Sequence, residues 1–257
     1  MTRPARLFTT ASLALLCFAL VAGPANAGPP FRTDDPEPVD YHHWEFYTFS
    51  TGTHVKDDTL GVLPAWEFNY GVFPNAMVHV VAPVAFDSPV GAPTVFGKGD
   101  LELGFKYRLI EQEKNGSRPS IGIFPLVEVP TGNQERGLGA GHPSVFLPVW
   151  IQKDFGDWTT YGGGGYWFNK NDNFGDKDYW FAGWLLQRKI TEKLTLGGEI
   201  FYQTADTVEG FDSAGFNIGG QYDFDEHNHL LFSAGRGFLH AQETNLYSWY
   251  VGWQITN

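Results

Sequence analysis

The sequence predicts an all-β protein, a transmembrane antiparallel up-and-down β-barrel of about 12 strands. Three observations support this fold. Apolar and polar residues alternate along many segments, these segments share a length of roughly 9–11 residues, and the connections between them are alternately short and long. A tilted strand of that length crosses a bilayer, and outer-membrane barrels have short turns at one end and longer loops at the other.

The alternation is clearest in residues 99–109. Because a strand sends successive side chains to opposite faces, this segment has one apolar face and one charged face. Alone, the pattern fits a soluble sandwich as well as a barrel, and the rest of the chain must decide between them. The apolar face carries Leu101, Leu103, Phe105, Tyr107 and Leu109, and the other face carries Asp100, Glu102, Lys106 and Arg108.

Residues 1–27 are interpreted as a signal peptide. Arg3 and Arg6 precede an apolar core at residues 7–21, and Ala25 and Ala27 form a small-x-small cleavage pattern. The only cysteine, Cys17, lies inside this segment, so the mature chain has no disulfide. The sequence therefore predicts export, with the cell outer membrane as the destination of a barrel.

Charge and composition exclude several classes of protein. The chain has 17 Lys+Arg against 29 Asp+Glu, a net charge of -12, which argues against nucleic acid as a partner. Aromatic residues make up 16% of the chain, a composition that favours strands. No mature segment approaches the roughly 18 consecutive apolar residues that a membrane-spanning helix needs.

Residues 28–42 are rich in proline and acidic residues and show no period, which predicts an irregular N-terminal arm. Two interpretations stay open: a loosely ordered tail, or a plug that folds into the barrel mouth with Asp34 and Asp35 facing the lumen. The barrel itself is expected over residues 43–257.

Alternation and turn residues mark the strands in order. Pro74 and Asn75 predict a tight turn, Asn115-Gly116 predicts a hairpin, and the four glycines at 162–165 predict a sharply curved strand. Longer loops are expected at 87–98, 131–142, 169–178 and 205–212. Strands are expected at 43–51, 60–70, 76–86, 99–109, 120–130, 143–153, 158–168, 179–190, 194–202, 214–222, 230–234 and from 247 to the C-terminal end.

Aromatic residues near the strand ends predict two interfacial girdles, where amphipathic rings lie at the level of the lipid headgroups. The alternative is that they fill an ordinary protein core. The residues concerned are Trp44, Trp66, Tyr70, Tyr107, Trp150, Trp158, Trp167, Tyr179, Trp249 and Trp253.

Charged residues on the inward parity are the candidate site. Single buried charges are costly, so we expect Lys106 and Arg108 to form a ladder of ion pairs with glutamates on neighbouring strands, namely Glu67, Glu102 and Glu128. Either these pairs only stabilise the lumen, or they shape a permeation path or bind a ligand's polar group. The candidates are Glu67, Asp100, Glu102, Lys106, Arg108, Glu128 and Glu199.

Neither metal nor enzyme chemistry is indicated. His42-His43 and the pair His227 and His229 lack partners at metal-ligand spacing, and the sequence indicates no cofactor. His142 and Ser144 could begin a hydrolase triad, but the chain has no G-x-S-x-G motif and no identifiable acid partner. We therefore expect no catalytic residues.

Four motifs occur in a fixed order: the segment 30–36 (PFRTDDP), His43-Trp44-Glu45, the 99–109 strand, and Val129-Pro130-Thr131-Gly132. Together they resemble the outer-membrane transporters associated with the meta-cleavage pathway of phenol degradation, which are distantly similar to the FadL/TodX channels. The chain departs from the usual barrel ending, because Asn257 stands in place of a terminal aromatic residue.

The resemblance implies a passive transporter or channel for small hydrophobic or aromatic compounds. Its implied partners are outer-membrane lipid, the small hydrophobic or aromatic ligand and the barrel assembly machinery. Two alternatives stay open: a structural or ligand-binding barrel without transport, and an outer-membrane hydrolase.

Overall fold

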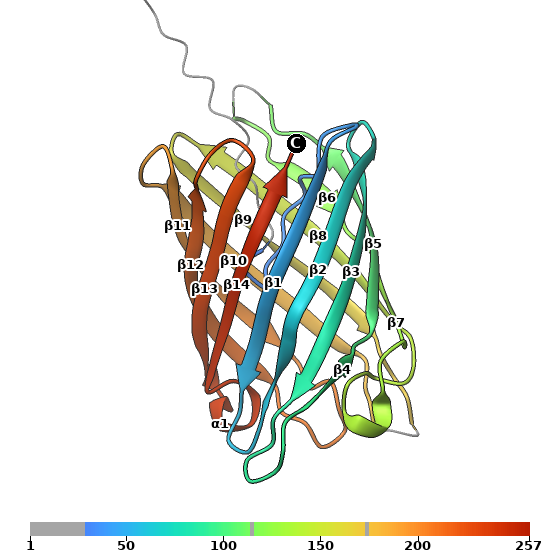
Figure 1. The fold of residues 1–257 in the computed structure, drawn as a ribbon. Helices are drawn as coiled ribbons and strands as arrows, with labels where there is room; N and C mark the ends of the chain where they lie inside the picture. Colours follow the sequence, from blue (N-terminus) through green and yellow to red (C-terminus); the bar gives the residue numbers. More distant parts are fainter. Residues whose placement is uncertain (1–28, 114–115, 173–174) are drawn as a thin grey trace, which may run out of the picture.

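The computed structural model describes residues 29–113, 116–172 and 175–257, and the expected signal peptide at 1–27 lies outside them. The described residues form a closed antiparallel β-barrel with almost no helix (Figure 1), so the predicted fold class is confirmed. Closure comes from pairing of the first strand with the last, β1 with β14. The first seven strands are β1 (Trp44–His54), β2 (Thr59–Phe73), β3 (Ala76–Asp87), β4 (Val95–Lys98), β5 (Leu101–Ile110), β6 (Ser120–Ile123) and β7 (Leu126–Val129). The others are β8 (Ser144–Phe155), β9 (Trp158–Phe168), β10 (Tyr179–Lys189), β11 (Leu194–Gln203), β12 (Ser213–Asp223), β13 (Asn228–Leu239) and β14 (Tyr247–Thr256).

These fourteen strand segments make the twelve strands of the barrel wall. Both β4 and β5 pair with β3, so together they form one interrupted barrel strand. Both β6 and β7 lie between β5 and β8, so they form a second interrupted strand. The break between β6 and β7 falls at Phe124 and Pro125, within the strand expected at 120–130. Pro125 and, on β8, Pro148 have no N–H to donate, so the hydrogen-bond ladder cannot continue through them.

Two expected boundaries are wrong. The strand expected to end at Ala234 continues as β13 to Leu239, because glycines at 235 and 237 conceal the alternation that Arg236 and Phe238 continue. The loop expected at 87–98 contains β4, which lengthens the hairpin that starts in β3.

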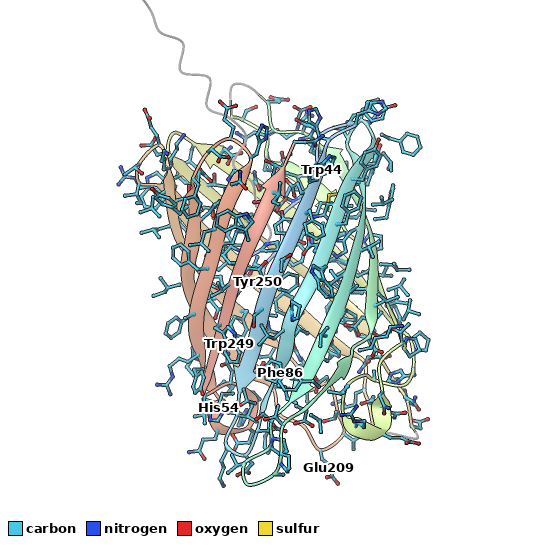
Figure 2. All side chains as sticks on the ribbon, viewed as in Figure 1. Trp44, His54, Phe86, Glu209, Trp249 and Tyr250 are labelled. Atoms are coloured by element: carbon cyan, nitrogen blue, oxygen red, sulfur yellow. The ribbon has the colours of Figure 1, made fainter. Side chains whose placement is uncertain are left out.

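Apolar side chains cover the outside of the wall, and polar side chains point inward (Figure 2). On β5, Leu109 is 53% exposed whereas Lys106 is 3% exposed. Three of the expected girdle residues are instead inside: Trp150 is buried in the interior, and Trp167 and Tyr179 stack in a row with Phe146. Their parity is that of the lumen, since their strand neighbours Val149 and Trp180 are exposed on the outer face.

The two ends of the barrel differ in their connections. The start of β1 and the end of β14 lie at one end, together with the short turns (Figure 1). The longer loops, with the short helices η1 (Gln134–Arg136) and α1 (Ala241–Thr244), lie at the other end. Backbone hydrogen bonds join these loops, for example from Lys56 N–H to Gln242 O at 2.7 Å. Within the described ranges, the structure has no helix long and apolar enough to span a membrane.

Candidate functional site

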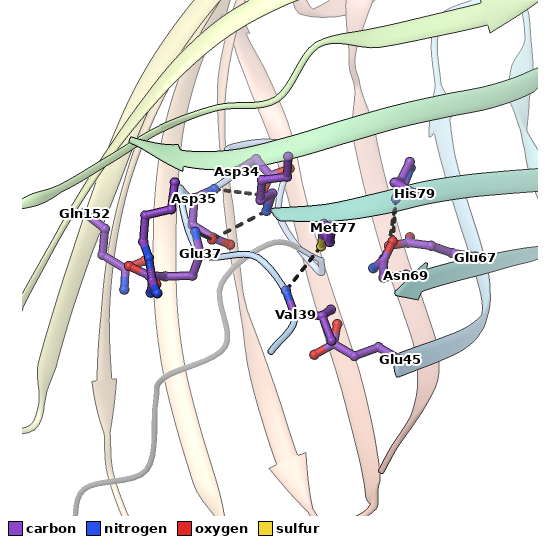
Figure 3. A network of polar contacts seen from close by, with 12 residues as sticks. Asp34, Asp35, Glu37, Val39, Glu45, Glu67, Asn69, Met77, His79 and Gln152 are labelled. Carbon is purple, nitrogen blue, oxygen red and sulfur yellow. Dashed lines mark hydrogen bonds and ion pairs between the residues drawn. The ribbon is translucent and has the colours of Figure 1, made fainter. Parts of the chain in front are cut away.

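The N-terminal arm lies inside the barrel (Figure 3). Thr33 and Asp35 are fully buried although their segment is irregular. The arm's contacts come from strands on different sides of the wall. Ser233 on β13 donates to Pro30 O at 2.6 Å, and on β6 an added Cβ at Gly122 would lie 2.9 Å from Pro36 Cβ. The arm therefore crosses the lumen.

Glu199 on β11 holds the arm at Arg32 and Thr33. Its Oε1 accepts from the Arg32 N–H at 2.9 Å and from Asn217 Nδ2 at 2.6 Å. Its Oε2 accepts from the Thr33 N–H at 2.8 Å and from Thr33 Oγ1 at 2.6 Å. Four donors thus satisfy a carboxylate that is only 2% exposed. Gly183 on β10 provides the space, since a Cβ there would lie 2.1 Å from Thr33 Oγ1.

Lys106 and Arg108 on β5 hold the next part of the arm. Lys106 Nζ lies 2.8 Å from Asp34 Oδ1 and 3.5 Å from Asp35 Oδ1, and Arg108 pairs with Glu37. The expected ladder between these two cations and the glutamates of neighbouring strands is therefore wrong. The physical reason is distance: both side chains extend into the lumen, where the arm supplies nearer carboxylates.

Two of the wall glutamates, Glu67 and Glu102, instead lie beside His79, a histidine that the sequence did not single out. Figure 3 shows His79 with Asn69 and Glu67. His79 Nε2 lies 2.9 Å from Glu102 Oε1, and His79 Nδ1 lies 2.7 Å from Asn69 Oδ1 and 3.5 Å from Glu67 Oε1. Asn69 Nδ2 also donates to Glu67 Oε1 at 2.8 Å. His79 sits in a strand that is apolar at nearly every position. It is the one polar residue within the strand expected at 76–86, and this was the only available signal.

The two other acidic candidates are Asp100 and Glu128. Asp100 contacts the loop between β7 and β8, and Glu128 contacts Ser144, the first residue of β8 after that loop. Asp100 accepts from the backbone N–H groups of Gly132 and Ala140, each at 2.7 Å, so it anchors this loop. Glu128 accepts from Ser144 Oγ at 2.7 Å. The ring nitrogens of His142 lie 3.1 Å from Ala140 O and 2.8 Å from Asn169 O.

Aromatic side chains fill much of the interior next to the arm. The Phe146 and Trp167 rings stack with centroids 4.8 Å apart, and Trp167 stacks on Tyr179 at 5.7 Å. The Arg32 guanidinium lies 5.1 Å from the Phe181 ring centroid and 4.4 Å from that of Phe201. The buried apolar cluster consists of Val39, Met77, Phe124, Phe146, Trp150, Phe181 and Phe201.

A cavity of about 390 Å³ lies between the arm and the wall formed by β1, β2, β3 and β5. Phe124, Met77 and Leu126 supply apolar surface, and Glu45 and Glu102 supply carboxylates. Residues from the short-turn end, such as Asn257, also line it, so the cavity lies toward that end. In the ranges that the structure describes, no three His, Cys, Asp or Glu side chains are grouped as metal ligands.

Comparison with known proteins gives a family and a fold. Residues 43–253 match the family described as "Putative MetA-pathway of phenol degradation". An outer-membrane channel from Pseudomonas putida F1 is similar in structure, with a TM-score of 0.70 and 14% identity over 87% of this chain and 98% of that one. The NanC porin has a TM-score of 0.57 and 10% identity over 82% of this chain and 98% of its own. At such identities the similarity shows the fold alone. A comparison with curated proteins finds no match.

Proposed function

The chain belongs to the family described as "Putative MetA-pathway of phenol degradation", and from this premise we propose that it is an outer-membrane channel for the passive passage of small hydrophobic or aromatic compounds. The observation that carries the proposal is the aromatic interior. Rings of Phe146, Trp167 and Tyr179 form a continuous stack inside the wall, which offers apolar compounds successive contacts of similar strength. Such contacts suit passage better than one tight site would.

In this proposal the arm is a plug. Asp34 and Asp35 hold it to Lys106, and Glu199 holds it at Thr33. The remaining inward charges, Glu67, Asp100, Glu102, Arg108 and Glu128, border the path that the plug leaves. Because residues 29–40 of the plug are held by side-chain contacts and burial rather than by strand pairing, which begins at the bridge between Tyr41 and Gly71, they can be displaced without opening the wall.

The experiment that tests the channel proposal measures the flux of labelled solutes into liposomes whose membrane contains the purified protein. We expect a radiolabelled aromatic acid such as benzoate, whose charge slows its passage through bare lipid, to enter faster than into protein-free liposomes, and a variant lacking residues 29–40 to pass larger solutes as well. A variant lacking 205–212, a loop outside the lumen wall, is the control for shortening the chain. If neither the wild type nor the arm deletion gives flux, the channel proposal is wrong.

A barrel that binds ligands without transport is the second candidate. The crossing arm favours it, because Thr33 and Asp35 are sealed between opposite walls. The flux experiment separates the two, since a binding barrel retains its ligand in both forms. No catalytic step belongs to either proposal.

We further propose that residues 1–27 are removed on export and that the barrel assembly machinery inserts the mature chain into the outer membrane. The apolar outer face supports lipid as the surrounding partner. N-terminal sequencing of protein from an outer-membrane fraction tests this, with Gly28 expected as the first residue. Recovery of the protein from the soluble periplasmic fraction would contradict it.

A further inference from the structure

Arg32, in the arm, differs from the two β5 cations that extend into the lumen. Lys106 is paired with Asp34, and Arg108 is paired with Glu37. In the part of the chain that the structure describes, no carboxylate lies within ion-pair distance of the Arg32 guanidinium, and Arg32 is exposed inside the barrel. Because opposite charges attract strongly in a confined interior, an unpaired guanidinium there offers a place for an anion.

Only neutral groups hold the Arg32 guanidinium in place. It lies 5.1 Å from the Phe181 ring centroid and 4.4 Å from that of Phe201, and both distances are within the range of cation–π contacts, which is about 6 Å. Its Nη2 donates to Gln203 Oε1 at 2.8 Å, the one hydrogen bond that the guanidinium makes to the described residues. These contacts orient the group without neutralising its charge, and they leave most of its N–H donors for a ligand.

The two carboxylates associated with this site are already engaged. Glu199 accepts from the Arg32 backbone N–H, not from its side chain, and three further donors satisfy the same carboxylate. Asp206 accepts from Gln203 Nε2 at 3.3 Å, so the Gln203 amide separates this carboxylate from the guanidinium. Neither carboxylate therefore serves as the counter-ion of Arg32.

The Arg32 side chain lies next to apolar surface on the way to the long-loop end. It borders the cavity beside the arm and extends to Gln203, the last residue of β11 at that end. The Phe181 ring, which it contacts, lies 6.4 Å from the ring of Phe146, a member of the aromatic stack. A ligand with an anionic group and an apolar body can therefore contact the guanidinium and the rings together.

We propose that Arg32 binds the carboxylate of small organic acids that have an apolar body, and that the site therefore prefers anions to neutral and cationic molecules of the same shape. The planar guanidinium presents paired N–H groups to the two carboxylate oxygens, and the neighbouring rings contact the apolar body. This inference rests on the proposed function and adds a charged group to its substrate class.

Calorimetric titration of the mature protein in an uncharged detergent tests the proposal. The probes are benzoate, benzamide and benzylamine, which share a ring and differ in charge. We expect benzoate to bind at least roughly tenfold more tightly than benzamide, because hydrogen bonds between charged groups account for a factor of this size. Equal binding of benzoate and benzamide would overturn the proposal. Tighter binding of benzylamine than of benzoate would also overturn it, in favour of a site for cations.

Substitutions at Arg32 locate the effect. Arg32→Gln removes the charge, and we expect its affinity for benzoate to fall roughly tenfold. Arg32→Lys keeps the charge without the planar fork, so it should keep a smaller preference for benzoate over benzamide. Arg236→Gln is the matched control, because Arg236 is an exposed arginine of the wall, on β13. If Arg32→Gln binds benzoate as tightly as this control does, Arg32 is not the binding residue.

Hydrogen exchange at the Thr33 amide, which donates to Glu199 at 2.8 Å, shows whether the arm stays docked in each variant. Weaker benzoate binding while this amide stays protected assigns the loss to the guanidinium. If Arg32→Gln releases the arm, Arg32→Lys decides the matter. A docked Arg32→Lys variant with no preference for benzoate over benzamide would contradict the proposal.

Binding in detergent does not require flux, so the two proposals fail separately. Tighter binding of benzoate than of benzamide, without flux, would support the anion site and contradict the channel. Flux of benzoate through a protein that binds benzoate and benzamide equally would do the reverse. Heat-dependent gel mobility of each variant shows that the barrel has folded.

Discussion

Glu199 is the residue that most directly fixes the arm, because both of its oxygens accept from arm N–H or O–H groups. In Glu199→Gln, the amide NH₂ group must face a donor, so we expect the docked arm to lose on the order of 2 kcal/mol. Trypsin should then cleave after Arg32, because in the wild type the next residue, Thr33, is fully buried. Mass spectrometry of the digested protein measures the cut.

Glu209→Gln is the control for this cut, because Glu209 is exposed in the loop that follows the same strand (Figure 2). Cleavage after Arg32 at the wild-type rate in Glu199→Gln would mean that Glu199 does not hold the arm.

Asp178 shows how a single carboxylate orders a loop at the long-loop end. The N–H groups of Lys170 and Asn169 donate to its Oδ1 at 2.8 Å each, and with the Tyr166 hydroxyl they lower the pKa of Asp178. A lowered pKa means that the folded loop prefers the ionised form. The stabilisation is complete above the ordinary aspartate pKa of about 3.9 and is lost as pH falls through the lowered value.

We therefore expect the Asn169 and Lys170 amides to lose protection from hydrogen exchange as the pH falls below about 4, relative to their intrinsic rates. Asp178→Asn should show reduced protection without this pH dependence. Protection that stays constant down to pH 2 in the wild type would contradict the role given to this carboxylate.

Among the elements, the arm depends on ion pairs in the interior. Lys106 is 3% exposed and its partner Asp35 is fully buried, so removing the cation leaves buried negative charge uncompensated. We expect Lys106→Met to destabilise the protein by about 3–5 kcal/mol. The midpoint of the heat-induced shift in gel mobility measures this change.

Lys106→Arg keeps the charge and is the comparison for Lys106→Met. A smaller loss in Lys106→Arg than in Lys106→Met is expected. Equal losses in the two variants would point to packing against Phe124, whose ring centroid lies 4.8 Å from Lys106 Nζ, rather than to charge.

Element by element, alternation predicted which side chains of β5 and β8 face outward, because the outward positions are apolar along β5 and along β8 as far as Ile151, with Lys153 near the end of β8 as the exception. It could not predict the partners of Lys106, since the arm has no period from which its path could be read. Trp150 and Trp167 were assigned to the interfacial girdles because they are tryptophans near strand ends, and not from their parity. Their positions on the inward parity were visible in the sequence and identify them as interior residues.

For the whole molecule, the number of barrel strands and the alternation of short and long connections followed from the sequence, because both depend on local patterns repeated along the chain. The interruption at Phe124 and Pro125 did not, since it depends on a second proline, Pro148, on the neighbouring strand. The carboxylates around His79 depend in the same way on register between β2, β3 and β5.

The barrel as a whole should require detergent and resist unfolding in cold SDS. Its sheet is closed by the pairing of β1 with β14, so the folded form should migrate faster than the heated form on a gel. Electrophoresis of boiled and unboiled samples measures this difference. Solubility of the folded protein without detergent would contradict the assignment of the apolar outer face to lipid.

The contacts of the arm also impose an order on biogenesis. Residues 30–37 are synthesised before every strand, yet their partners include Glu199 on β11 and Ser233 on β13, near the other end of the chain. The arm therefore has no complete docking site until most of the wall exists. The arm, which is synthesised before the strands, is therefore among the last described segments to reach its native position, and it stays without its partners while the sheet forms around the space that it will occupy.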